Sequence, residues 1–448
     1  MPHSLFESSS DLKQENTFRL FTRTVQRTLH AHEVFFSFSA SFCAFLEDPK
    51  DNGKQFLVSK AGETHWLRER DQADQFFHRW KQQLQKIAID FPAIQHLIYA
   101  SYEVSTLLET LPQPKSEPPS GYLCLHKPAW SLCFDLLTDE VHIASSISEE
   151  HLDSLEALVH AEADISRQDF PEKLSPVQSS YLPISYEAAV ERVKAYISAG
   201  DVFQVNIARF WQMDFPDNAL LALYRKLRHF NPAPFSCFVQ LDDLTLISSS
   251  PERLFSLSSD GYAETRPIAG TRRRSDGDDD LLLQDELLLS DKERAEHIML
   301  VDLERNDLGR VCKAGTIHVN EMMGIEKYAT VQHIVSNVRG KLAENRDVVD
   351  LFRAMFPGGT ITGCPKVRCM EIIHEQEQQA RGPYTGSVGY TAWDGSADMN
   401  ILIRTFWQHQ GQLNWAAGAG IVADSDPLDE RIETEHKAAG LLRALYTE

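Results

Sequence analysis

The stretch Gly358-Gly-Thr-Ile-Thr-Gly-Cys-Pro-Lys366 combines residue types and a spacing that are typical of a ligand-binding loop. A phosphate loop follows the pattern Gly-x-x-x-x-Gly-Lys-Ser/Thr, in which backbone N–H groups and the lysine bind phosphates. Gly358 and Gly363 keep the glycine spacing, but Cys364-Pro365 replaces Lys-Ser/Thr, and proline has no N–H to donate. The pattern therefore argues against a nucleotide loop and leaves another anionic or hydroxyl-bearing ligand, or a structural turn.

Three glutamates stand where carboxylates could do chemistry. Glu252 follows the strand-like run Leu244–Ser249, and strand ends often line clefts. Glu296 lies inside a helix-like segment, and Glu433 and Lys437 are one helical turn apart, on one face. Each also has an ordinary interpretation: a solvated turn acid, an exposed helix acid, and a surface ion pair.

Other polar residues lie in apolar surroundings. Arg404 interrupts the strand-like run 401–405, so its cation needs either a structural partner or a ligand. His333 is flanked by Val, Gln and Ile, which is typical of a core histidine. The run 417–421 (Ala-Gly-Ala-Gly-Ile) follows a strand-like segment and favours close backbone approach to a ligand over a dinucleotide fingerprint.

The elements that must position these residues are helices and strands without regular β-α-β alternation. Ser185 is a candidate cap for a helix that ends near Gly200, and 202–211 alternates like a strand. Ser290 opens a capping box before a helix through Glu304, and Asp426-Pro427 begins the last helix. This order predicts an α+β fold of large sheets with helices packed outside.

Charge and composition restrict the class of protein. The formal charge of −21 over 448 residues argues against nucleic-acid and anionic-membrane partners. The first residues are polar and unlike a secretory or transit peptide, and the longest apolar run, 34–46, is too short to span a bilayer. Seven scattered cysteines suit a reducing compartment. We expect a soluble cytoplasmic protein.

The order of these motifs along the chain resembles the chorismate-utilising enzyme family. The shared motifs, in chain order, are Ser250-Pro-Glu252, Arg266-Pro-Ile-Ala-Gly-Thr271, Asp291–His297, Asp302–Arg310, Gly358–Lys366, Ile403-Arg404, Gly418-Ala-Gly420 and Glu433-x-x-x-Lys437. The resemblance covers 185–448 and implies a catalytic region there and a variable region at 1–165. The Pro- and Ser-rich composition of 166–184 predicts a linker between them. It implies large antiparallel sheets that form a sandwich with helices outside, as in anthranilate synthase component I.

The resemblance also assigns roles to residues. It implies that Glu296 and Glu433 bind Mg²⁺, which holds the ring carboxylate of chorismate, and that Glu252 protonates the departing C4 hydroxyl. Arg404 and Tyr384 would hold the enolpyruvyl carboxylate. The remaining positions that it places at the substrate are Gln204, Gly270, Thr271, His333, Thr360, Gly418, Ala419, Gly420 and Lys437.

Three differences within the family bear on the nucleophile and the product. Gln204 stands where water-using members have a lysine base, so the chain resembles the ammonia-using branch. No glutaminase motif of the Gly-x-Cys-x-Gly type occurs, so a separate glutamine amidotransferase subunit should supply ammonia. Ala269 replaces the covalent lysine of many aminodeoxychorismate synthases, as in anthranilate synthases, whereas 231–236 (Asn-Pro-Ala-Pro-Phe-Ser) resembles the aminodeoxychorismate form. We expect the aminodeoxychorismate-forming branch, with anthranilate formation as the alternative; a non-catalytic chorismate-binding subunit is disfavoured because all three glutamates are present.

Overall fold

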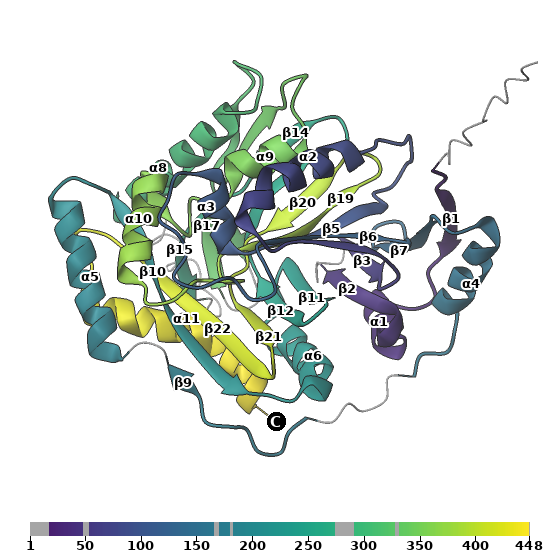
Figure 1. The fold of residues 1–448 in the computed structure, drawn as a ribbon, viewed down its shortest axis with the longest axis horizontal. Helices are drawn as coiled ribbons and strands as arrows, with labels where there is room; N and C mark the ends of the chain where they lie inside the picture. The colour runs from purple at the N-terminus through teal and green to yellow at the C-terminus, as the bar shows by residue number, and fades with distance from the viewer. Residues whose placement is uncertain are drawn as a thin grey trace, which may run out of the picture.

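The computed structural model describes residues 18–47, 53–164, 170–179, 182–273, 291–327 and 331–447. Within these ranges the chain forms two large antiparallel sheets with helices around them (Figure 1). The helices are α1 (Ala31–Ser37), α2 (Ala73–Gln83), α3 (Ser105–Leu108), α4 (Glu149–Val159), α5 (Pro183–Ser198), α6 (Leu220–Phe230), α8 (Asp291–Gly309), α9 (Val348–Met355), α10 (Lys366–Gln376) and α11 (Pro427–Tyr446).

The first sheet contains 12 strands within the described ranges. In order across the sheet they are β1 (Phe21–Gln26), β8 (Glu140–Ser145), β7 (Trp130–Asp135), β3 (Lys54–Ser59), β2 (Phe42–Glu47), β11 (Phe235–Leu241), β12 (Leu244–Ser250), β21 (Thr405–His409), β22 (Gln412–Ile421), β10 (Gln204–Asp214) and β18 (Gly363–Cys364), with β9 (Gln178–Ser179) beside β10.

The second sheet contains 10 strands in the same described part of the chain. Their order is β15 (Ile268–Arg273), β17 (Val331–Lys341), β14 (Tyr262–Thr265), β13 (Arg253–Leu257), β20 (Ala397–Asn400), β19 (Ser387–Ala392), β5 (Ile94–Ala100), β6 (Leu123–Pro128) and β4 (Gly62–Leu67), with β16 (His318–Lys327) beside β17.

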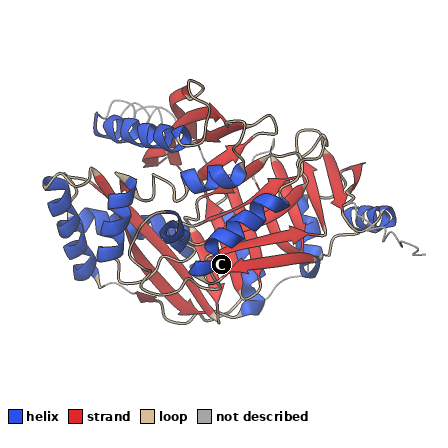
Figure 2. Cartoon of the chain, turned by 45° about the horizontal axis from the view of Figure 1, so that its top comes forward, coloured by secondary structure: helices blue, strands red, loops and turns tan. Residues whose placement is uncertain are grey.

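The two sheets pack face to face and bury an apolar layer between them. Phe210 and Leu246 of the first sheet belong to the same buried cluster as Leu97 and Tyr99 of the second. The other face of the first sheet packs against α1, α4, α6 and α11, whereas α2 and α9 join the core on the far side of the second. Figure 2 shows the helices outside the strands. The predicted α+β sandwich with helices outside is therefore confirmed.

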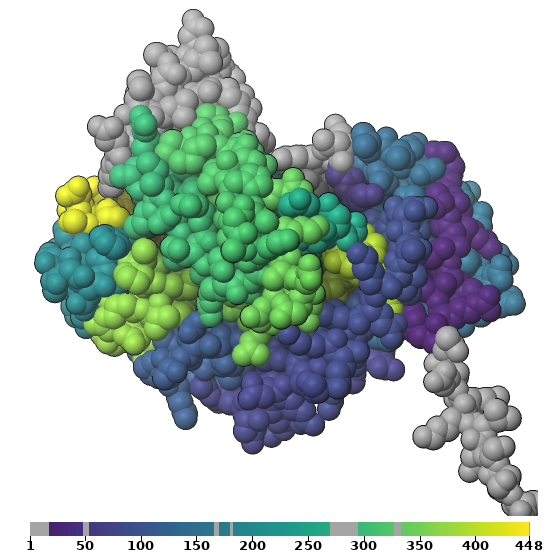
Figure 3. All heavy atoms as spheres, turned by 90° about the horizontal axis from the view of Figure 1, so that it is seen from above, coloured from purple at the N-terminus to yellow at the C-terminus, as the bar shows by residue number. Residues whose placement is uncertain are grey.

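Both sheets draw strands from both ends of the chain. β2 pairs with β11, and β5 pairs with β19, although almost 300 residues separate β5 from β19. In the space-filling view the purple and blue N-terminal segment lies against the green part of the chain (Figure 3). The predicted regions 1–165 and 185–448 thus share both sheets, because each supplies strands that the other pairs with.

Of the three predicted helix caps, one is confirmed, one is wrong and one lies outside the described residues. Asp426 caps α11, and its carboxylate accepts the N–H groups of Leu428 (2.9 Å) and Asp429, so that prediction is confirmed. The predicted Ser185 cap is wrong: α5 begins at Pro183, whose fixed φ suits the first helical position. The cap predicted at Ser290 lies outside the described residues.

The segment 401–405 is not the continuous strand that its apolar residues predict. β20 ends at Asn400 in the second sheet and β21 begins at Thr405 in the first, so 401–404 carries the chain between sheets. Arg404 has φ = 49°, a left-handed conformation that costs a non-glycine residue free energy. Its half-buried side chain is therefore presented at a break between strands. The run 417–421, expected after a strand, instead lies inside β22.

No helix in the described ranges is both long and apolar enough to cross a membrane.

Candidate active site

The glycines of β22 open one face of the first sheet beside β10. A Cβ at Gly418 would lie 2.5 Å from Asn206 Oδ1 and 2.8 Å from the Tyr384 hydroxyl, and one at Gly420 would lie 2.3 Å from Gln204 Nε2. All three separations are too short for a carbon atom. A side chain at either position of β22 would therefore have to displace the polar side chains that occupy this space. We call this face of β10 and β22 the pocket face.

Two carboxylates approach the pocket face from different helices. Gln204 Nε2 on β10 donates to Glu296 Oε1 of α8 at 3.0 Å. Lys437 Nζ of α11 donates to the Gly418 carbonyl at 3.0 Å and pairs with Glu433 at 2.7 Å. The predicted one-turn pair is thus confirmed, and both glutamates lie near the glycine segment of β22.

Glu252 lies directly after β12, as its position behind an apolar strand predicted. Its backbone carbonyl accepts the N–H of Ile401 at 3.0 Å, which fixes it beside the break that carries Arg404. The side chain is 6% exposed, and burial raises its pKa to about 7, while nearby Thr360, Arg404 and Lys437 act in the opposite direction. A carboxyl group that holds its proton near neutral pH can serve as a general acid.

The glycine-rich loop connects these groups. Gly363 has φ = 129° and pairs with Val205 of β10; a Cβ there would lie 2.0 Å from the Gln204 carbonyl oxygen. Thr360 Oγ1 lies close enough to Glu252 to lower its pKa, yet neither Thr360 Oγ1 nor Glu252 Oε1 has a hydrogen-bond partner among the described residues. The loop therefore brings a hydroxyl to the acid.

Lys366, the last residue of the glycine-rich loop, forms its contacts within the protein. Its ammonium group pairs with Asp307 of α8 and donates to the Met355 carbonyl at 3.2 Å. Because that ion pair is largely buried, Lys366 holds the loop to α8 and α9. The argument against a nucleotide loop agrees with this arrangement.

The remaining predicted positions are less well defined. His333 is 2% exposed on β17 of the second sheet, opposite Thr271 on β15. Gly270 and Thr271 lie on β15, but the side chain of Thr271 is not among the described ones. Ala419 is fully buried, pairs with Ile207 of β10 and belongs to the core cluster behind the pocket face. Substrate contacts at these four positions stay predictions, as they do at the other predicted site residues.

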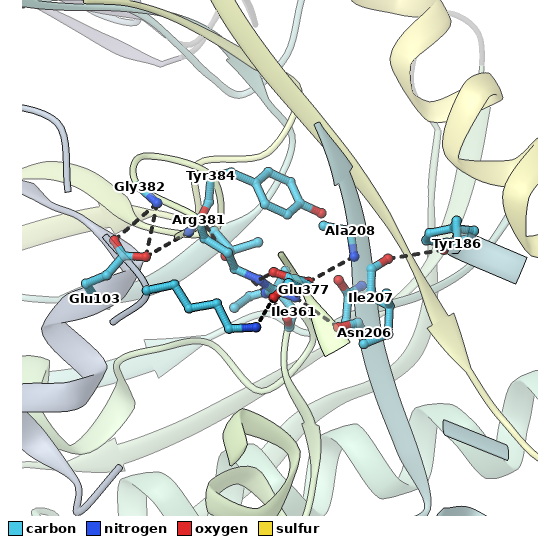
Figure 4. A network of polar contacts seen from close by, with 12 residues as sticks. Glu103, Tyr186, Asn206, Ile207, Ala208, Ile361, Glu377, Arg381, Gly382 and Tyr384 are labelled. Atoms are coloured by element: carbon cyan, nitrogen blue, oxygen red, sulfur yellow. Dashed lines mark hydrogen bonds and ion pairs between the residues drawn. The ribbon is translucent and has the colours of Figure 1, made fainter. Parts of the chain in front are cut away.

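A cluster that the sequence did not suggest bonds to the edge of β10 that faces away from β22. Arg381 is 2% exposed, pairs with both oxygens of Glu377 (2.6 and 2.9 Å), and donates to the carbonyls of Ile361 (3.0 Å) and Asn206 (2.9 Å). Figure 4 shows Arg381 between these groups, with Tyr384 nearby. Glu103 accepts the N–H groups of Arg381 and Gly382. We call Glu103, Glu377 and Arg381 the arginine cluster.

The arginine cluster could not be recognised from spacing alone. Glu377 and Arg381 are four residues apart, the separation of a helical pair, but α10 ends at Gln376. Asn206 was also missed, although its position two residues after Gln204 on an alternating strand places both side chains on one face.

A separate cavity of about 400 Å³ lies between the two sheets. Pro234, Phe235 and Ser236 of the segment 231–236 line it, together with the ion pairs Arg253–Asp398 (2.9 Å) and Arg266–Glu326 (2.5 Å). The described residues around this cavity include none of the predicted substrate positions.

Comparison with known proteins places the chain among enzymes. The family described as "chorismate binding enzyme" matches residues 41–443. Aminodeoxychorismate synthase component 1 of Bacillus subtilis is 46% identical over 289 residues, which are 64% of this chain and 61% of that protein. An anthranilate synthase component I-like protein of Synechocystis is 51% identical over 263 residues, 58% of this chain and 54% of that protein. The matched part thus spans less than two thirds of either relative.

Solved structures agree with the fold. Anthranilate synthase component I of Streptococcus pneumoniae superposes with a TM-score of 0.75 at 25% identity, covering 98% of this chain and 95% of that one. MenF, the menaquinone-specific isochorismate synthase of Escherichia coli, has a TM-score of 0.72 at 20% identity, covering 95% of each chain, and supports the fold alone.

Proposed function

The chain belongs to the chorismate binding enzyme family, and from this premise we propose that it is the aminating component of an aminodeoxychorismate synthase. It would convert chorismate and ammonia to 4-amino-4-deoxychorismate and water. The observation that carries the proposal is the pocket face, where the neutral amide of Gln204 lies on the same side as a proton-holding acid, Glu252, and the cations Arg404 and Lys437. An amide suits an incoming nucleophile that needs no general base.

The chain's own residues account for the reaction in simple steps. Arg404 and Lys437 would bind the substrate's carboxylates and offset the chain's negative charge near the pocket. The Glu252 carboxyl gives its proton to the departing C4 oxygen, the C–O bond breaks and water leaves. A C–N bond forms from the lone pair of ammonia, so the product carries an ammonium group. Glu252, left as carboxylate, takes a proton from solvent.

The residues present fit a magnesium ion. Glu296 and Glu433 provide hard oxygen ligands beside the glycine segment of β22, held there by Gln204 and Lys437. Among the described residues no group of three His, Cys, Asp or Glu side chains could enclose a metal. Mg²⁺ commonly binds through one or two carboxylates and completes its shell with substrate and water. When bound, it would neutralise a carboxylate of chorismate.

A specific residue favours the alternative product. Ala269 lies on β15 and has no amino group, so a lysine-linked intermediate cannot form at that position. Anthranilate formation from the same substrates is therefore the second candidate, and the two relatives compared above carry names from both activities. A separate glutamine amidotransferase subunit would supply ammonia in either case.

The test is a product analysis. The purified chain is incubated with chorismate, Mg²⁺ and ammonium, and the products are separated, with Glu252→Gln as the inactive control. We expect a product that becomes 4-aminobenzoate only after a downstream lyase is added. Fluorescent anthranilate formed without added enzymes would refute the aminodeoxychorismate assignment and support the alternative.

A further inference from the structure

Two carboxamide groups on β10 present unsatisfied oxygen atoms at the pocket face. Gln204 is 5% exposed and Asn206 is 8% exposed. Gln204 Oε1 and Asn206 Oδ1 are buried without a hydrogen-bond partner among the described residues. Leaving a buried acceptor unpaired is costly, so two such oxygen atoms on one pocket face require a donor from a ligand or a water molecule.

The position of Asn206 is fixed by its backbone, which leaves its side chain available. Its carbonyl accepts from Arg381 Nη2 at 2.9 Å, and its N–H donates to the Thr362 carbonyl at 2.9 Å. Figure 4 shows Asn206 on β10 near Glu377 and Arg381. The side-chain oxygen lies against Gly418, which is the position where a Cβ would collide with it. The backbone of Asn206 is held by two hydrogen bonds, and its side-chain oxygen has no partner among the described residues. This oxygen is therefore a preorganised acceptor.

The ligand that completes these oxygens must donate hydrogen bonds. In the proposed reaction chorismate has only one hydroxyl donor, on C4, and that group is engaged by Glu252. Ammonia has three N–H donors and a lone pair. Side chains at i and i+2 of a strand lie about 6.6 Å apart at their bases, which leaves room for one small molecule that donates to both oxygens at about 3 Å.

Amides are also the appropriate chemical choice for this task. A carboxylate at position 206 would attract ammonium, whose nitrogen has no lone pair for attack, whereas a carboxamide accepts N–H bonds and carries no charge.

We propose that Asn206, together with Gln204, binds the ammonia molecule that attacks chorismate. This proposal rests on the proposed aminating function and adds a catalytic residue to it. Two N–H groups donate to the two carboxamide oxygens, which directs the lone pair from β10 toward the substrate. The C–N bond forms and the C–O bond breaks as described above, so the atoms and the proton from Glu252 balance without a further reactant.

The experiment compares Asn206→Leu, which preserves the shape of the side chain, with the wild-type chain and with Gln212→Leu. Gln212 is an exposed residue of the same strand whose side chain bonds to Gln178, so it controls for an altered β10. The KM for ammonium is measured at fixed pH, and chorismate binding with Mg²⁺ is measured separately by calorimetry. We expect Asn206→Leu to raise the ammonium KM about 10-fold or more, as loss of one buried hydrogen bond predicts, with chorismate affinity unchanged within about 2-fold.

Other outcomes overturn the proposal. An ammonium KM unchanged in Asn206→Leu, or a chorismate affinity that weakens as much as the ammonium KM rises, would show that Asn206 contacts chorismate or serves only the fold. If Asn206→Leu does not fold, Asn206→Ser carries the same comparison. A wild-type chain that does not consume chorismate with ammonium refutes the proposed function itself, and that result is distinct from a chain that is active but insensitive at position 206.

Discussion

The arginine cluster lies at the edge of β10 that faces away from β22, whereas the pocket face is formed by β10 and β22 together. Both regions bury charged and polar groups, but the hydrogen bonding of these groups differs. In the arginine cluster the groups bond to one another: Arg381 reaches Glu377 and two carbonyls, and Glu103 accepts main-chain N–H groups. On the pocket face the side-chain oxygens Glu252 Oε1 and Asn206 Oδ1 lack hydrogen-bond partners among the described residues. The hydrogen bonds of the first region are completed by the protein, whereas those of the second would be completed by the ligand that we propose.

The pKa alone would not separate the two regions. Burial raises the pKa of Glu103 to about 7 and that of Glu252 to about 7. Backbone N–H groups bind the Glu103 carboxylate, whereas one oxygen of Glu252 has no partner among the described residues. Perturbed pKa values occur in structural networks as well as in active sites. The informative difference is the incomplete hydrogen bonding of the group that faces the pocket.

The largest expected effect is on catalysis. Glu252→Gln removes the proton that the departing oxygen needs, so kcat should fall by about 10³-fold while the free energy of unfolding stays level or rises. For the wild-type chain at a fixed concentration of neutral ammonia, kcat/KM for chorismate should decline as pH rises through about 7, because Glu252 then loses its proton. Steady-state rates and urea unfolding measure both quantities, with Glu264→Gln on β14 as the control. Equal losses of activity in the two variants would contradict the role of Glu252.

In the arginine cluster we expect a substitution to lower the stability of the fold. Arg381→Met leaves Glu377 as a buried, unpaired charge, so the free energy of unfolding should fall by about 3–5 kcal/mol. Urea unfolding measures this change. The double variant Arg381→Met with Glu377→Gln should recover part of the loss, since it removes the charge as well as its partner. A single variant as stable as the wild type would contradict the interpretation that this cluster is structural.

Glu103 provides a pH test with a smaller effect. Its pKa is raised from 4.5 to about 7 in the folded protein, so the folded chain retains a proton that the unfolded chain loses in this window. The associated stability is fully present below pH 4.5 and is lost as pH rises through about 7, by at most about 3 kcal/mol. Glu103→Gln should lack this slope in unfolding measured from pH 4.5 to 7.5. If the free energy of unfolding changed equally with pH in Glu103→Gln and in the wild-type chain, Glu103 would not be the source of the pH dependence.

The smallest expected effect concerns the proposed metal ligands. Glu433→Gln should raise the Mg²⁺ concentration needed for half-maximal activity by about 10-fold, because one hard oxygen ligand is weakened. Glu435→Gln, on the same helix but paired with Arg209 and Arg431, should leave that concentration unchanged. A Mg²⁺ titration of the rate distinguishes them, and equal shifts would argue against a specific role for Glu433.

Sequence patterns could predict features that depend on neighbours along the chain. The cap at Asp426 and the pair Glu433–Lys437 follow from helical geometry, and both are present. The sequence pattern predicted a strand around Arg404 because its neighbours are apolar. Those neighbours are instead buried where the chain passes from the second sheet to the first. The residues next to Arg404 in the sequence do not indicate that the chain crosses from the second sheet to the first at this point.

Contacts between distant residues of the candidate site could not be predicted from sequence patterns either. Gln204 and Glu296 were associated only through the resemblance to a family, because 92 residues separate the two ends of their hydrogen bond. Arg381 was missed because its partners include carbonyls of Ile361 and Asn206, which become neighbours only after β10 and the glycine-rich loop have packed together. Long-range pairing decides these contacts, and single-sequence periodicity does not encode it.

The pairing of β5 with β19 has a consequence for how the chain is made. A ribosome adds about 5–20 residues per second, so β5 is complete tens of seconds before β19 emerges to pair with it. During that interval an apolar strand of the second sheet presents an open edge. We expect the nascent chain to need protection from aggregation for most of its synthesis, and the sandwich to close only when its last third has been translated.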